Sequence, residues 1–420
     1  MLLLMQLKNN YHKLILRVNS KMSKAIKSIV SQDVRDKVVL IRADLNIPIQ
    51  NGKIQDITRV SRSLPTIKFL LKEGSKIVIC SHLGRPNGEY VENYSLKPLV
   101  SALSDILKIE VKFSTSCIGQ DAIKAKKNLK SGEILLLENV RFHKGESENN
   151  AEFARDLSDF CDFFVNDAFS CSHRAHASLH AITNFLPSFS GILLDEEINA
   201  LTSVLKLPVK PVAALVGGAK ISTKINIIEF LITKMDFIII GGAMANTFIL
   251  AQGYNVGKSM VERDAIDMAT KILEKSKKLN CKLIFPQDLI VSKYFEENSD
   301  HKIVDISNIP SEMMALDIGP KSIENIKSIF KNIKTLLWNG PLGAFEINPF
   351  GMGTFTLAKI AADLTVKDEL ITVAGGGDTA SALNKAGVAG DFTYISSAGG
   401  AFLEWLEGIE LPAISALGNN

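Results

Sequence analysis

A regular alternation of short apolar runs with longer amphipathic segments is the feature that most limits the fold of this sequence. Most of the runs are continuous rather than alternating, as in strands that are buried on both faces of a parallel sheet. The predicted strands span residues 38–42, 77–80, 134–137, 163–165, 212–216, 237–240, 282–285, 335–338, 370–373 and 392–395. The predicted helices between them span residues 60–73, 151–160, 224–235, 264–279 and 354–363. This order of elements predicts α/β domains with parallel sheets.

Length and composition indicate a globular chain of about two domains, because 420 residues are more than a single hydrophobic core usually serves. The formal net charge of +3 gives no reason to expect a nucleic-acid partner. The apolar runs are shorter than the ~18 residues of a membrane-spanning helix, so no membrane association is predicted. The five cysteines are odd in number and include no C-x-x-C pair. This pattern argues against a disulfide framework or a zinc site and for a reducing, cytoplasmic location.

The first 21 residues differ from the rest because they carry four basic residues and no acidic one. Gln6 and Lys8 interrupt the apolar start, which falls short of the ~7–15 continuous apolar residues of a signal peptide. Two interpretations stay open: a start upstream of a true start at Met22, and a transit peptide. We expect residues 1–21 to be a disordered extension or a start-site artefact, outside the fold.

The boundary between the domains is predicted between Ser190 and Pro211. Residues 195–205 have a helical pattern, and Pro208 and Pro211 follow it. A helix here would join the domains as a semi-rigid hinge. We therefore expect an N-terminal domain of residues 22–190, a hinge helix in residues 191–207 and a C-terminal domain of residues 208–404.

Several cationic side chains of the first domain lie close in sequence to glycine, proline and asparagine residues, which favour turns and loops. They are Arg59, His82, Arg85, Arg141 and Arg174. Guanidinium groups bind carboxylates and phosphates through paired hydrogen bonds, so the set predicts a site for an acidic substrate. Each has a structural alternative, such as a surface ion pair for Arg141 or a purely structural role for His82.

Asp44 and Asn46 end the first predicted strand within the string RADLNIP. One interpretation is an Asx-type turn before Pro48. The other gives the two side chains hydrogen bonds to substrate hydroxyls. The residues alone leave both open.

Glycine-rich turns of the second domain follow predicted strands. They are Gly217-Gly218-Ala219-Lys220, Gly241-Gly242 and Gly375-Gly376-Gly377-Asp378. Glycines allow close backbone approach, and the amides at a helix start favour phosphate. We expect Lys220 and Lys224 to share one helix face and Asp378 to hold a magnesium ion. The structural alternatives are a helix cap with solvated lysines and a plain tight turn.

Three partial motifs are disfavoured, and only the first is rejected. The stretch that ends in Gly257-Lys258-Ser259 has three residues between its glycines where a P-loop has four, and it follows a helical pattern. The turn at Gly375 lacks the acidic residue that a dinucleotide fingerprint places ~20 positions later. His173 and His176 have no carboxylate at metal-ligand spacing.

The motifs taken in order resemble one family. The strings RADLNIP, SHLGRP, LLENVRFH, FVNDAF with HRAH, GGAKIS, GGAMANTF, WNGPLGAFE, GGGDTA and GGAFLEWLEG are similar to those of phosphoglycerate kinases. The resemblance runs from about Met22 to about Gly418. It implies two Rossmann-like α/β domains joined by a hinge helix, with residues 405–420 returning to the N-terminal domain.

The resemblance also implies roles for individual residues. The positions that match the 3-phosphoglycerate site are Asp44, Asn46, Arg59, His82, Arg85, Arg141 and Arg174. The positions that match the nucleotide site are Lys220, Lys224, Phe295, Asn339, Glu346, Gly375, Gly376, Gly377, Asp378 and Thr379. Arg59 and Lys224 are the expected catalytic cations, and Asp378 is the expected Mg²⁺ ligand. The implied protein is a cytoplasmic monomer that transfers a phosphoryl group between ATP and 3-phosphoglycerate.

Two departures from the family pattern are notable. Ala398 stands where the last phosphate-binding turn usually has glycine, and a positive φ there would be strained. Ala315 replaces a glycine near the expected adenine pocket. Neither removes a charge, so we expect activity to persist. Two rival functions are a nicotinamide-dependent oxidoreductase, suggested by the Gly375 turn, and a non-catalytic sugar-phosphate sensor.

Overall fold

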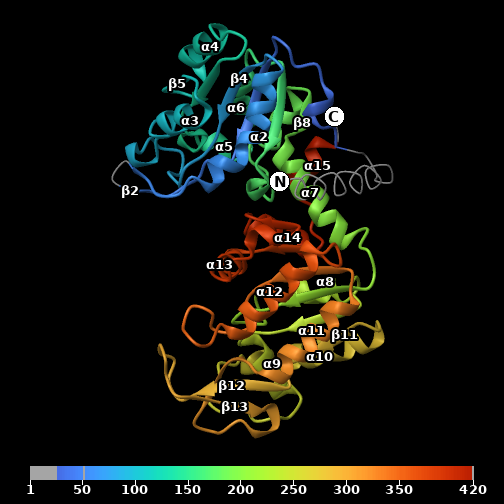
Figure 1. The fold of residues 1–420 in the computed structure, drawn as a ribbon. Coiled ribbons are helices and arrows are strands. Elements are labelled where there is room, and N and C mark those ends of the chain that lie inside the picture. The colour runs from blue at the N-terminus through green and yellow to red at the C-terminus, as the bar shows by residue number, and fades with distance from the viewer. Residues whose placement is uncertain (1–25, 51–52, 419–420) are drawn as a thin grey trace. The chain divides into compact units, whose positions relative to one another are not determined.

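The structure, a computed structural model, describes residues 26–50 and 53–418. The predicted extension of residues 1–21 lies outside the described residues. The chain divides into two compact units (Figure 1). Unit 1 comprises residues up to Asn199 together with those from Glu410 onward, and unit 2 comprises residues 200–409. Helix α7 (Ile192–Leu205) crosses the division along the sequence.

Unit 1 is built on a sheet of six parallel strands. Their order is β5 (Val111–Ser114), β6 (Ile134–Leu137), β4 (Lys76–Cys80), β1 (Val38–Ala43), β7 (Phe163–Asp167) and β8 (Ser188–Ser190). Its helices are α2 (Thr58–Lys72), α3 (Leu99–Leu107), α4 (Gly119–Lys127), α5 (Lys144–Ser147), α6 (Ala151–Ser158) and α15 (Pro412–Leu417). A short hairpin joins β2 (Ile49–Gln50) to β3 (Lys53–Ile54).

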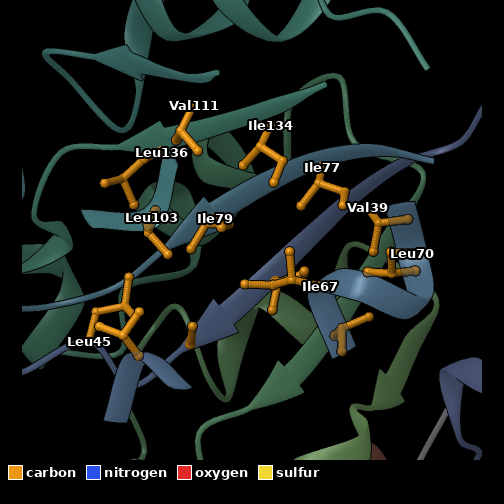
Figure 2. Packing of buried hydrophobic residues seen from close by; sticks show 14 of the residues in the cluster. Val39, Leu45, Ile67, Leu70, Ile77, Ile79, Leu103, Val111, Ile134 and Leu136 are labelled. Carbon is orange, nitrogen blue, oxygen red and sulfur yellow. The ribbon is translucent and has the colours of Figure 1, made fainter. Parts of the chain in front are cut away.

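The core of unit 1 forms between the sheet and its helices. Figure 2 shows Val39 of β1, Ile77 of β4 and Ile134 of β6 packed with Ile67 of α2 and Leu103 of α3. All five are fully buried. Burial of such a side chain contributes roughly 1.5–3 kcal/mol, so these contacts fix the sheet that carries the candidate site.

The C-terminal helix α15 packs within unit 1. Its Ala413 lies in a small apolar cluster with Ala168, Cys171 and Leu179. The Ala413 N–H also donates to the Ser172 carbonyl at 3.2 Å. The last helix of the chain therefore supports the segment that follows β7, where Arg174 lies.

Unit 2 has a second sheet of six parallel strands. Their order is β11 (Lys282–Ile284), β10 (Phe237–Ile240), β9 (Val212–Val216), β15 (Thr335–Asn339), β16 (Ile371–Gly375) and β17 (Tyr394–Ser396). Its helices are α8 (Ile225–Leu231), α9 (Met244–Ala251), α10 (Ile266–Lys278), α11 (Pro320–Asn332), α12 (Met352–Val366), α13 (Gly377–Lys385) and α14 (Gly400–Leu406). The direction in which successive strands are added reverses between β9 and β15. In open α/β sheets such a point is the usual ligand crevice.

The predicted fold class is confirmed, since both large sheets are parallel and covered by helices. Two details differ. Sequence reasoning missed the small antiparallel sheet of β13 (His301–Asp305), β12 (Asp288–Ser292) and β14 (Met314–Ile318), because most of β13 is exposed and it lacks an apolar run. Helix α8 begins after Lys224 and ends at Leu231, so the predicted helix of residues 224–235 is too long. None of the helices in the described part of the chain combines the length and hydropathy that a membrane span requires.

Candidate active site

The carboxyl ends of the strands in unit 1 lead directly into candidate residues. These are Asp44 after β1, His82 after β4, Arg141 after β6 and Arg174 after β7. β1 pairs with both β4 and β7, so it stands between them in the sheet. Because carboxyl ends of parallel strands meet at one edge, the fold brings these side chains to the same edge.

Arg59 is held at this edge by the turn after β1. It lies in the first turn of α2, with its Nη1 3.1 Å from Asp44 Oδ2. The same nitrogen donates to the Asn46 carbonyl at 2.9 Å. The Asn46 N–H donates to Asp44 Oδ1 at 3.2 Å, so the Asx turn is present. The Arg59 side chain is nevertheless 38% exposed. The turn therefore fixes the guanidinium and leaves part of it open to solvent.

His82 is positioned by a buried arginine that sequence reasoning missed. Arg42, in β1, has no exposed surface, and its Nη2 lies 3.1 Å from His82 Nδ1. Arginine can only donate, so Nδ1 accepts and a neutral ring carries its proton on Nε2. Burial and the charge of Arg42 hold the pKa of His82 well below its usual range. The expectation that His82 is a cation is therefore wrong, and it is a neutral hydrogen-bond donor. The available signal for Arg42 was a charge inside an apolar strand.

A buried carboxylate completes this network. Arg42 Nε donates to Ser178 Oγ at 2.9 Å, and that hydroxyl donates to Glu146 Oε1 at 2.7 Å. Glu146 Oε1 also lies 3.7 Å from His176 Nδ1. Burial, with Arg141 as the next cause, lowers the pKa of His176 to about 4. His176 is therefore neutral near pH 7.

Arg141 and the loop after β4 hold one another in place. Arg141 Nη1 donates to the Gly84 carbonyl at 2.8 Å, and the Gly84 N–H donates to Asn46 Oδ1 at 3.0 Å. Burial and the nearby Arg42 charge lower the pKa of Arg141, although it stays protonated. Arg174 and Arg85 are exposed. The edge thus combines anchored and solvent-facing guanidiniums, which produces a positive site suited to a small anion.

Asp44, His82 and Cys171 place three possible metal-ligand atoms within 4.8 Å of one another. The surroundings oppose a cation there. Both Asp44 oxygens are within hydrogen-bonding or ion-pair distance of Arg59, and His82 Nδ1 faces Arg42. Arginine donors therefore contact Asp44 and one nitrogen of His82, and their positive charge makes the cluster better suited to an anion than to a cation.

In unit 2 the two strands at the reversal point meet through glycine backbone. The Gly217 N–H donates to the Asn339 carbonyl at 2.9 Å. A Cβ on Gly217 would lie 1.9 Å from the Pro341 carbonyl oxygen. Gly340 has φ +102°, and a Cβ there would lie 2.2 Å from the Gly217 carbonyl oxygen. These approaches require glycine and leave a surface made of peptide groups.

Asn339 links three of the nucleotide-site candidates. Its Oδ1 accepts a hydrogen bond from Lys224 Nζ, and its Nδ2 donates to the Gly375 carbonyl at 2.7 Å. Burial lowers the pKa of Lys224, while the Asp378 charge opposes that effect. Asp378 itself is exposed in the first turn of α13. A lysine, a carboxylate and the amides of a helix start thus converge beside the carboxyl ends of β15 and β16.

The other nucleotide-site candidates have different surroundings. Thr379 is buried and accepts the Gly340 N–H at 2.7 Å. Lys220 lies in the loop before α8, so the expectation that it shares a helix face with Lys224 is wrong. Glu346 is exposed after β15, and Phe295 is 55% exposed on the connection from β12 to β13. Within the described residues, no hydrogen bond ties either side chain to the glycine turns.

The two departures have simple local outcomes. Ala398 does not have a positive φ and is buried, and its N–H donates to Ser396 Oγ at 3.2 Å. The anticipated backbone strain is therefore absent at this residue. Ala315 lies in β14, where its N–H donates to Ser259 Oγ at 2.8 Å. The stretch through Gly257 follows α9 rather than a strand, in agreement with the rejection of a P-loop.

Sequence comparisons point to a single family. Residues 29–409 match the family model described as "Phosphoglycerate kinase". A phosphoglycerate kinase of Agrobacterium fabrum is 48% identical over 385 residues, covering 92% of this chain and 96% of that protein. One of Rhodopseudomonas palustris is 48% identical over 396 residues, covering 94% and 99%.

Solved structures agree. The fold matches phosphoglycerate kinase from Coxiella burnetii with a TM-score of 0.88 and 40% identity, covering 94% of this chain and 99% of that one. It also matches the enzyme from Pyrococcus horikoshii with a TM-score of 0.77 and 31% identity, covering 93% and 98%. The similarity therefore extends over both units.

Proposed function

The chain belongs to the phosphoglycerate kinase family and is a glycolytic kinase; we propose that unit 1 binds 3-phosphoglycerate and unit 2 binds the nucleotide. The reaction is the reversible transfer of a phosphoryl group between ATP and the carboxylate of 3-phosphoglycerate. The observation that supports the assignment is the difference between the two sheet edges. Arginines crowd the edge of unit 1 around Arg42, whereas glycine amides form the edge of unit 2.

The substrate carboxylate needs no general base, because it is ionised near neutral pH. The protein's tasks are to position the two anions and to neutralise charge on the transferred phosphoryl group. In unit 1, Arg141, Arg174 and neutral His82 bind and orient the substrate. Arg59 provides the first catalytic cation, since its guanidinium is anchored at Asp44 and still partly exposed.

In unit 2, Lys224 provides the second catalytic cation. Its bond to Asn339 holds the ammonium beside the carboxyl end of β15. Burial lowers the lysine pKa but Asp378 opposes the shift, so Lys224 serves as a cation rather than a base. The amides of Gly375, Gly376 and Gly377 bind nucleotide phosphates at the start of α13.

Asp378 suits a magnesium ligand, because it is an exposed carboxylate beside those amides. The ion, when bound, would neutralise charge on the nucleotide phosphates. The magnesium role, the monomeric state and the cytoplasmic location remain parts of this proposal. Equilibrium dialysis with Mg·ADP can compare the protein with Asp378→Asn, which should bind the nucleotide more weakly only when magnesium is present.

An assay that couples 1,3-bisphosphoglycerate formation to NADH oxidation tests the function directly. ATP, Mg²⁺ and 3-phosphoglycerate should all be required. Isothermal titration then separates the rivals. ADP binding with turnover supports the kinase, and tight nicotinamide-cofactor binding without ADP binding supports an oxidoreductase. Binding of 3-phosphoglycerate without turnover supports a sensor.

Because the proposal gives each ligand its own unit, the two units must bring their ligands into line for transfer. The hinge closure predicted from the sequence is one way to do so. Small-angle scattering can compare the free protein, each binary complex and the ternary complex. Compaction should need both ligands, and an unchanged radius of gyration in the ternary sample would count against closure.

A further inference from the structure

Asp317 is a buried acidic side chain that the mechanism above does not use, and burial raises its pKa to about 8. It is the fourth residue of β14 and is 2% exposed. Its Oδ1 accepts the N–H of Ile318 at 2.9 Å, and its Oδ2 accepts the N–H of Gly353 at 2.8 Å. Gly353 lies in the first turn of α12, so the carboxylate caps the start of that helix.

The same carboxylate fills the space beside two glycines. A Cβ on Gly343 would lie 2.2 Å from Asp317 Oδ1, and one on Gly353 would lie 2.7 Å from it. Gly343 belongs to the segment of residues 340–346, which runs from β15 towards α12. Beside this contact, the Ala344 N–H donates to the Leu316 carbonyl at 2.8 Å. Asp317 therefore joins β14, this segment and the start of α12.

The segment of residues 340–346 forms part of the glycine surface. The Pro341 carbonyl is the atom that a Cβ on Gly217 would meet. The Leu342 carbonyl accepts the Gly242 N–H at 2.9 Å, and the Leu342 side chain occupies the space beside Gly241. A shift of the segment would consequently displace the turns after β9 and β10.

Asp288, in β12, provides a matched comparison. It is 3% exposed, and its oxygens accept the N–H groups of Ser322 at 2.8 Å and Lys321 at 3.0 Å. It thereby caps the start of α11, and a Cβ on Gly319 would lie 2.3 Å from its Cγ. The two aspartates share burial, helix capping and glycine contact. Only Asp317 contacts the segment of residues 340–346.

We infer that Asp317 is a positioning residue for the nucleotide site, which it serves by holding residues 340–346 in register with the start of α12. This inference rests on the proposed function, because it takes the glycine turns to be the nucleotide site. It assigns the nucleotide subsite a supporting carboxylate that contacts neither substrate nor metal.

The test compares Asp317→Asn with Asp288→Asn in the full chain. The asparagine amide at position 317 would direct N–H groups at backbone donors, so the segment should shift. Asp317→Asn should raise the Kd for ADP and the KM for ATP about tenfold or more and leave the Kd for 3-phosphoglycerate unchanged. Both substitutions should lower the Tm by similar amounts, because both aspartates are buried and cap a helix. Asp288→Asn should nevertheless leave the Kd for ADP within about twofold.

A second variant covers the case in which Asp317→Asn fails to fold. In Gly343→Ala the added Cβ would overlap Asp317 Oδ1 and displace the segment of residues 340–346, while the Asp317 side chain is retained. This variant should therefore also weaken ADP binding selectively. The inference is overturned if Asp317→Asn or Gly343→Ala folds and binds ADP as tightly as the unaltered protein. It is equally overturned if Asp288→Asn weakens ADP binding as much as Asp317→Asn. Failure of the unaltered protein to bind ADP would instead overturn the proposed function.

Discussion

The two units place their candidate sites at the same part of a parallel sheet but build them from different chemical groups. In unit 1 long side chains such as Arg59 and Arg141 line the edge, held by Asp44 and by the Gly84 carbonyl. In unit 2 the backbone itself forms the edge, because Gly217 and Gly340 leave no room for a Cβ. Under the proposed function, one fold holds a compact acid with guanidiniums in unit 1 and a polyphosphate with peptide amides in unit 2, since sheet order fixes only where the strands end.

Arg59→Ala should produce the largest effect, because unit 1 then loses the cation assigned to the transferred phosphoryl group. We expect turnover to fall by about 100-fold or more, the scale of losing an electrostatic stabiliser. Steady-state kinetics with both substrates saturating measure it. Near-normal turnover with only a raised KM would mean that Arg59 contributes to substrate binding and not to the chemical step.

Gly217→Ala tests whether unit 2 depends on backbone approach. The added Cβ would overlap the Pro341 carbonyl, which should cost about 1–3 kcal/mol of unfolding free energy and weaken ADP binding. Gly390→Ala is the matched control, because a Cβ there has no atom within 4 Å. Denaturant unfolding and ADP titration measure both. Equal ADP affinities in the two variants would mean that nucleotide binding in unit 2 does not depend on the close backbone approach at Gly217.

Arg141→Lys tests the side-chain half of the comparison more gently. Lysine keeps the charge but cannot both donate to the Gly84 carbonyl and present a planar pair of donors. The Kd for 3-phosphoglycerate should rise about fivefold to tenfold, with ADP affinity unchanged. Calorimetry with each ligand tests this, and equal losses for both ligands would indicate a general disturbance of the fold.

Asp167→Asn tests how the stability of unit 1 depends on pH. Burial raises the pKa of Asp167 from its ordinary value of 3.8 to about 7, and its Oδ2 has no hydrogen-bond partner in the described part of the chain. The folded state therefore keeps a proton that the unfolded chain releases, so stability falls as pH rises from about 4 to 7. Asparagine cannot ionise and should flatten this slope.

Chemical unfolding at several pH values measures that slope. Asp105→Asn, at an exposed position of the same unit, is the control and should leave the slope unchanged. An unaltered slope in Asp167→Asn would mean that Asp167 is not the group whose ionisation weakens the fold.

The amino-acid sequence by itself determined the fold class, since continuous apolar runs and helical periodicity are local patterns. It also identified which residues follow the strands, because glycine turns and charged groups interrupt those runs. The resemblance to phosphoglycerate kinases then indicated the specific reaction. Asp44, His82 and Gly217 were therefore accessible from the sequence as candidates, although their states were not.

Only the tertiary structure decided how those residues are held. Arg42 and Ser178 are 136 positions apart and meet in a buried hydrogen bond, which no local pattern encodes. Burial, together with the charge of Arg42, holds the pKa of His82 well below its usual range, so His82 is neutral rather than cationic. Likewise, no local pattern singled out Asp317, whose contact with Gly343 places it beside the glycine surface. The physical reason is that burial and hydrogen-bond partners set the charge and position of a polar group, and both come from residues far away in the sequence.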